Sequence, residues 1–96
     1  MFVGIARYEL RLPDAASLKD KRAVLRRLVS MLRQKFNVSC SEVDHLDLWQ
    51  RSTVGVSLVA DTQFHARRVL HEIERHVRTH HGVELLSDSV EFVSPE

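Results

Sequence analysis

The sequence predicts one α+β domain in which two helices pack on one face of a four-stranded antiparallel sheet. A chain of 96 residues suits a single domain, and a hydrophobic fraction of 44% is enough for one core. Apolar residues recur at every second position in some segments and at helical spacing in others, in the order βαββαβ. Two strand–helix–strand units on one sheet form a ferredoxin-like sandwich, which we expect for residues 1–96.

The first two elements are a strand and a strongly patterned helix. Residues 2–12 are apolar, with charged residues alternating toward the end, and Pro13 stops the strand. Ser17 is typical of a helix N-cap, and Asp20 stands three residues later, where a capping box places an acid. Asn37 is expected to end the helix. Its buried stripe consists of apolar residues at helical spacing: Leu18, Leu25, Leu28, Val29, Leu32 and Phe36.

Two further strands are expected in the middle of the chain. Residues 38–44 form a short strand with a less regular pattern, and residues 45–50 form a connection. Residues 51–61 alternate between apolar and smaller side chains, which is the period of a strand. The connection is short enough to join neighbouring antiparallel strands.

The second helix and the last strand complete the pattern. Asp61 or Thr62 is expected to cap this helix, and Gly82 is expected to end it. The helix presents one apolar face, made of Ala66, Val69, Leu70, Ile73 and Val77. Residues 83–93 supply a last strand or a bent pair of strands.

Composition favours a cytoplasmic protein. The chain has one cysteine, Cys40, which excludes an intrachain disulfide and fits a reducing compartment. No apolar run approaches the roughly 18 residues of a membrane-spanning helix. The segment after Met1 lacks the basic residues and the long apolar run of a signal peptide. We therefore expect no membrane partner.

Charge is distributed unevenly along the chain. Residues 18–36 hold seven Lys or Arg and one acid, a net charge of +6, whereas the whole chain carries +1. Four of these cations, Lys19, Arg22, Arg26 and Arg33, share a strip about 60° wide beside the apolar stripe. Such a strip suits a nucleic acid, because the contacts of cations with successive phosphates add up. The alternative is a solvated helix face. The residues expected to bind nucleic acid are Lys19, Lys21, Arg22, Arg26 and Arg33.

Three short motifs carry a family resemblance. The stretch SLKDKR at 17–22, followed by FNVS at 36–39 and EVDHLDLWQR at 42–51, resembles the YlxP-like family of small uncharacterised bacterial proteins. The resemblance extends from Val3 to about Val93 and implies a ferredoxin-like fold. Genes of that family tend to lie beside those for transcription-termination, translation-initiation and ribosome-maturation factors. The resemblance therefore implies a role near RNA or the ribosome, and it implies no catalytic residues.

The connection at 44–51 is rich in chemical groups. Tryptophan and arginine are the residue types favoured at the centres of recognition surfaces. The expected partner-binding residues are Asp44, His45, Asp47, Trp49 and Arg51. Two carboxylates and an imidazole also suit a divalent metal or acid–base chemistry, so a metal-dependent enzyme at Asp44, His45 and Asp47 is a third hypothesis. The structural alternative is a turn capped by the Asp side chains, with Trp49 packed as an anchor.

Other motifs of catalysis or cofactor binding are absent from the sequence. It contains no P-loop, no dinucleotide-binding glycine motif and no nucleophile elbow. His76 and His80 are four residues apart but lack the pattern of a zinc protease. We therefore expect a protein without a cofactor or a small-molecule substrate, and binding is favoured over catalysis.

Two interpretations remain in front. The first is a non-enzymatic RNA- or ribosome-associated protein that binds through its basic first helix. Reading of bases across the sheet is not expected, because Tyr8 has no aromatic counterpart between residues 52 and 61. The second is a protein-interaction module or homodimer that uses the Trp49–Arg51 region and the sheet surface.

Overall fold

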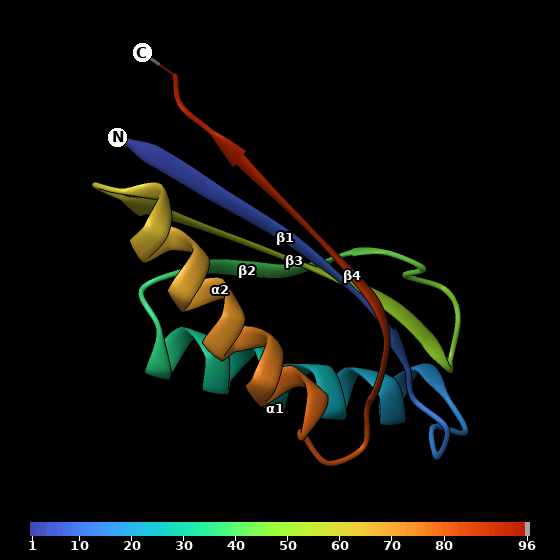
Figure 1. The fold of residues 1–96 in the computed structure, drawn as a ribbon. Coiled ribbons are helices and arrows are strands. Elements are labelled where there is room, and N and C mark those ends of the chain that lie inside the picture. Colours follow the sequence, from blue (N-terminus) through green and yellow to red (C-terminus); the bar gives the residue numbers. More distant parts are fainter. Residues whose placement is uncertain (96) are drawn as a thin grey trace.

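The computed structural model describes residues 1–95 and has the expected order of elements. They are β1 (Phe2–Arg11), α1 (Leu18–Lys35), β2 (Ser39–Asp44), β3 (Arg51–Ala60), α2 (Gln63–Arg78) and β4 (Glu84–Val93). The sheet order is β2-β3-β1-β4, and all neighbouring strands are antiparallel. Both helices lie on one side of this sheet (Figure 1). The prediction of a ferredoxin-like α+β fold is confirmed.

The core lies between the helices and the even-numbered residues of the two central strands. Tyr8 is opposite Val54 in the register of β1 and β3, and both side chains are fully buried. The helices contribute buried residues at the predicted spacing: Leu25, Leu28, Leu32, Ala66, Leu70, Ile73 and Val77. The Tyr8 hydroxyl donates to the carbonyl of Leu70 (3.4 Å), and burial raises the pKa of this hydroxyl. Tyr8 is therefore a core residue and offers no stacking platform on the open face.

The helix starts follow the predicted capping chemistry. The Ser17 hydroxyl accepts the backbone N–H of Asp20 (3.0 Å), and the Asp20 carboxylate accepts the N–H of Ala16 (3.0 Å). At the second helix Thr62 is the cap, and its hydroxyl accepts the N–H of His65 (3.1 Å). These bonds satisfy donors that have no partner within the helix. No helix within residues 1–95 is long and apolar enough to cross a membrane.

The end of α2 differs from the expectation. The helix ends at Arg78 with Thr79 as its C-cap, so Gly82 does not occupy the capping position. Instead Gly82 lies in the turn before β4 with φ +92, a conformation that glycine adopts without strain. A Cβ atom there would lie 3.2 Å from the Val24 side chain of α1. The left-handed backbone at residue 82 and the closeness of this turn to α1 therefore explain why this position holds a glycine.

The two edges of the sheet are β2 and β4. Most of β4 is exposed, and the strand is continuous although its register with β1 shifts at Glu9 and Leu10. The strand carries Glu84, Asp88 and Glu91 and no Lys or Arg. Like charges that face each other across a strand pair are destabilising, so this edge is protected against pairing with its own copy.

Replacing Gly82 by Ala tests the account of this turn. We expect the unfolding free energy to fall by about 1 kcal/mol or more, because the backbone is left-handed and the new methyl crowds Val24. Urea denaturation measures the change. Gly55→Ala is the control, since its φ is not positive and its close neighbour is the exposed Val43 side chain. Equal losses in the two variants would contradict this explanation.

Candidate nucleic-acid interface and adjoining loop

Exposed cations lie along the whole length of α1, and three of them share one strip near its start. Lys19, Arg22 and Arg26 are all exposed, and none forms an ion pair in the part of the chain that the structure describes. These three residues, which we call the cationic strip, extend over about 10 Å of helix. Arg33 is exposed but engaged, because its guanidinium donates to the carbonyl of Cys40 in β2 (2.6 Å). Arg27 and Lys35 are also exposed and form no ion pair among the described residues, so the positive charge of α1 extends beyond the cationic strip.

Lys21 does not belong to this surface, which corrects the prediction for this residue. Its side chain is 0% exposed. Its Nζ donates to Glu42 Oε2 (2.9 Å) and to the carbonyl of His45 (2.8 Å), and it lies 3.3 Å from the carbonyls of Leu46 and Arg51. The ammonium is thus used entirely inside the protein and has no surface to offer a phosphate.

Helical periodicity contains a signal for this burial that a count of charges misses. Lys21 follows Lys19 by two residues, about 200° around the helix, which places it within the stripe formed by the apolar residues. A lysine in such a stripe is tolerated when acceptors surround its ammonium. The acceptors come from the connection after β2, and no pattern in the sequence identifies them.

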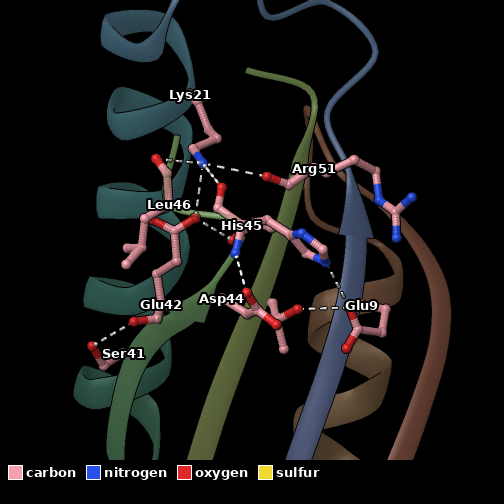
Figure 2. A network of polar contacts seen from close by, with 10 residues as sticks. Glu9, Lys21, Ser41, Glu42, Asp44, His45, Leu46 and Arg51 are labelled. Carbon is pink, nitrogen blue, oxygen red and sulfur yellow. Dashed lines mark hydrogen bonds and ion pairs between the residues drawn. The ribbon is translucent and has the colours of Figure 1, made fainter. Parts of the chain in front are cut away.

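Glu42 is a functional residue of this network that sequence analysis did not single out. It lies opposite Val54 in the sheet and therefore faces the helices. Its Oε2 accepts both the Lys21 ammonium and the Ser52 hydroxyl (2.8 Å). In Figure 2 these groups meet between α1 and the hairpin. No buried side-chain nitrogen or oxygen among the described residues lacks a hydrogen-bond partner, so the buried charges are compensated.

The turn after β2 is held by His45 and its neighbours. His45 adopts φ +61, and its N–H donates to the Asp44 carboxylate (2.7 Å). Its carbonyl accepts the N–H of Leu48 (3.1 Å) as well as the Lys21 ammonium. The Asp44 side chain therefore caps the turn, as the structural alternative predicted, and the Lys21 ammonium binds the inner side of the same turn.

The His45 ring lies on the open side of the sheet. Its Nε2 is 3.9 Å from Glu9 Oε2, which forms an ion pair when the ring is protonated. Glu9 Oε2 also accepts the hydroxyl of Thr53 (2.6 Å), a fully buried residue of β3. Figure 2 shows the His45 ring directed toward Glu9, while its carbonyl points to Lys21. This residue thus joins polar groups on both faces of the sheet.

The hypothesis of a metal-dependent enzyme finds no site at Asp44, His45 and Asp47. Within residues 1–95 no group of three or more His, Cys, Asp or Glu side chains is arranged to hold a metal ion. Asp44 is occupied with backbone capping, and the His45 ring faces Glu9. The Cys40 thiol is buried, and burial raises its pKa to about 11, which disfavours the reactive thiolate.

Trp49 is not the packed anchor that the structural alternative predicted. Its side chain is 55% exposed, and Leu46 and Leu48 of the same connection are about equally exposed. A hollow of about 440 Å³ is lined by five consecutive residues, Asp47, Leu48, Trp49, Gln50 and Arg51. We call residues 46–51 the Trp49 loop.

The Trp49 loop is attached to the segment that leads into α1. The Gln50 side-chain amide donates to the carbonyls of Pro13 (3.3 Å) and Ala15 (3.1 Å), and the Gln50 carbonyl accepts the N–H of Leu12 (3.0 Å). The Lys21 ammonium holds the loop from its other side. In Figure 1 this loop lies beside the start of α1. The two predicted binding regions therefore adjoin at one end of the molecule.

Comparisons with known proteins agree with the resemblance found in the sequence. The pattern of the family described as "Protein of unknown function (DUF503)" matches residues 3–90. The "Uncharacterized protein YlxP" of Bacillus subtilis (strain 168) is 39% identical over 71 residues, covering 74% of this chain and 77% of that protein. Among solved structures, the "De novo designed protein Foldit4" matches with a TM-score of 0.57 over 100% of both chains at 11% identity. That likeness concerns the fold alone.

Replacing Lys21 by Met tests the role of the buried ammonium. We expect the unfolding free energy to fall by about 3 kcal/mol, because Glu42 and three carbonyls lose their donor inside the protein. Thermal and urea denaturation measure the loss. Lys19→Met, two residues earlier on the exposed side of α1, is the control and should change stability by less than about 0.5 kcal/mol. Similar losses in the two variants would contradict the assigned role.

Proposed function

We propose that this chain, which belongs to the family described as "Protein of unknown function (DUF503)", is a non-enzymatic RNA- or ribosome-associated protein that binds through α1. The binding surface in this proposal is the cationic strip of Lys19, Arg22 and Arg26. Arg33 adds positive charge at the far end of the helix, beside β2. Each residue of the strip contributes a charge to a phosphate backbone, so the affinity depends strongly on salt.

A contrast between the two helices carries this proposal. On α2 two of the four exposed arginines are neutralised within the helix, since Arg75 pairs with Glu72 and Arg78 pairs with Glu74. The other two, Arg67 and Arg68, lie over aromatic rings. Ion pairs at spacings of three and four are the ordinary pattern of a solvated helix face. On α1 the strip residues have no acid within ion-pair distance in the described part of the chain. Repulsion among unpaired cations is relieved by a polyanion, which is the reason to prefer a phosphate ligand to a solvated face.

The geometry also favours recognition of RNA shape and backbone by α1. The strip extends about 10 Å along the helix, which matches a few consecutive phosphates and is too short for a long groove. Base reading over the sheet, as in domains with aromatic residues on their central strands, has no support because Tyr8 is in the core. Contacts of cations with phosphates give affinity with little sequence preference.

Charge reversal tests the proposed function. The Arg22→Glu/Arg26→Glu variant should bind ribosomal RNA about tenfold or more weakly in fluorescence anisotropy at low salt, and the dependence of log affinity on log salt should become shallower by about two. Arg75→Glu/Arg78→Glu is the control, because it makes the same change in net charge on α2. An α1 variant that binds like the parent, or no more weakly than the α2 variant, would disprove the proposal.

A second candidate, self-association, is favoured by an apolar row on the open face of the sheet. Val59, Val3 and Val93 are neighbours across β3, β1 and β4, and Val59 is 67% exposed. Ile5, which lies opposite Glu91 of β4, extends this row along β1. In this proposal a second copy related by a two-fold axis covers the valines of both chains. We propose this face as the contact of a homodimer.

A lysine in the apolar row tests the homodimer. The parent should show a mass that rises toward two chains with concentration in light scattering, and Val59→Lys should remain a monomer over the same range, because a buried unpaired charge opposes association. Phe64→Lys, on the exposed surface of α2, is the control and should dimerise like the parent. A parent that stays monomeric at every concentration would refute this second candidate.

A further inference from the structure

The hollow in the Trp49 loop presents three kinds of side-chain group to the solvent. Its lining includes the indole of Trp49, the guanidinium of Arg51 and the carboxylate of Asp47. Figure 2 shows the Arg51 side chain directed away from the Lys21 network, although its carbonyl takes part in it. The Gln50 amide, in contrast, is committed to the carbonyls before α1. A flat ring, a planar cation and an acceptor are thus free around one hollow.

The framework around this hollow is fixed at both ends. On one side Gln50 is bound to the segment that precedes α1. On the other side Leu46 and Arg51 offer their carbonyls to Lys21, which lies in the same helical turn as Lys19 and Arg22. The backbone on both sides of Trp49 is therefore held at the start of α1, which lowers the cost of ordering this loop on binding.

We propose that Trp49 stacks on an unpaired base of an RNA strand whose phosphates lie along the cationic strip. This inference rests on the proposed function and narrows it to RNA with single-stranded or looped nucleotides. Single strands are commonly bound by this combination, in which cations follow the backbone and an aromatic ring supports a base. The hollow of about 440 Å³ has room for such a base.

The charges at this end of the molecule favour different positions for the two parts of a nucleotide, with the RNA phosphates on α1 and the base in the hollow. Within the hollow the Asp47 carboxylate repels a phosphate and the Arg51 guanidinium offsets part of that repulsion, whereas Lys19, Arg22 and Arg26 attract a phosphate to α1. An uncharged base is free of that repulsion, and its exocyclic amino group can donate to the Asp47 carboxylate. Adenine, cytosine and guanine carry such a group and uracil does not. The geometry therefore favours an amino-bearing base in the hollow.

An apolar protein segment is the competing occupant for the exposed Leu46, Leu48 and Trp49. The adjoining strip argues for RNA, because its three cations have no acid within ion-pair distance in the described residues and a phosphate chain supplies the missing charge.

The experiment uses the fact that Trp49 is the one tryptophan of the chain. A labelled single-stranded oligoadenylate of about 12 nucleotides and a fully paired duplex of similar length are titrated into the protein. Anisotropy of the label measures binding, and indole fluorescence reports whether a base contacts Trp49. We expect oligoadenylate, and not the duplex, to quench the indole.

Variants of the loop separate stacking from other contacts. Trp49→Ala should weaken oligoadenylate binding about tenfold and leave duplex binding unchanged, and Trp49→Phe should recover part of the loss because it keeps a ring. Leu48→Ala, an equally exposed apolar neighbour, is the matched control and should have little effect. Oligouridylate should bind more weakly than oligoadenylate in the parent and lose this difference in Asp47→Ala.

The possible outcomes distinguish this inference from the function on which it rests. If both RNAs bind and Arg22→Glu/Arg26→Glu abolishes binding, but the indole signal and Trp49→Ala show no effect, stacking is refuted and the phosphate contact stands. Equal losses in Trp49→Ala and Leu48→Ala without quenching indicate a merely apolar contact and also refute stacking. Binding that survives the charge reversal refutes the proposed function itself.

Discussion

The buried ammonium of Lys21 is the interaction on which this end of the molecule depends. Of the side chains that the structure describes, it is the one charged group that is completely buried. Glu42 compensates its charge, and the carbonyls of His45 and Leu46 in the connection and of Arg51 at the start of β3 surround it. Desolvating an ammonium is costly, so the contact persists because every partner is in place. The first turn of α1 is thereby fixed to β2, to the start of β3 and to the connection between these strands.

This one contact organises the charges of α1 into two groups with different roles. Lys21 points inward and holds a connection, whereas Lys19, Arg22 and Arg26 point outward and remain unpaired in the described part of the chain. The connection that Lys21 holds carries the exposed Trp49. An internal salt bridge thus joins the loop that carries an exposed aromatic ring to the helix that carries the cationic strip, and the functional proposals build on that connection.

Much of the fold could be predicted from periodicity, and the errors have identifiable physical causes. The stripes of both helices, the helix caps at Ser17 and at Asp61 or Thr62, and the order of elements along the chain follow local rules that act over a few residues. Gly82 was assigned to the end of α2, but it serves a turn whose shape is set by the approach of α1. A count of charges alone places Lys21 on the surface, whereas its position around the helix places it within the apolar stripe. Its partner Glu42 comes from a distant segment, and such a pairing exists only once the helix has packed on the sheet.

The central claim is that RNA contacts the end of the molecule that Lys21 organises. Backbone amide shifts of the labelled protein, recorded by NMR during titration with a single-stranded RNA, test this claim most directly. The account predicts that the largest changes fall in residues 19–26 and 46–51, with small changes in α2 and on the open face of the sheet. Changes confined to the open face or to α2, with residues 19–26 unaffected, would contradict it.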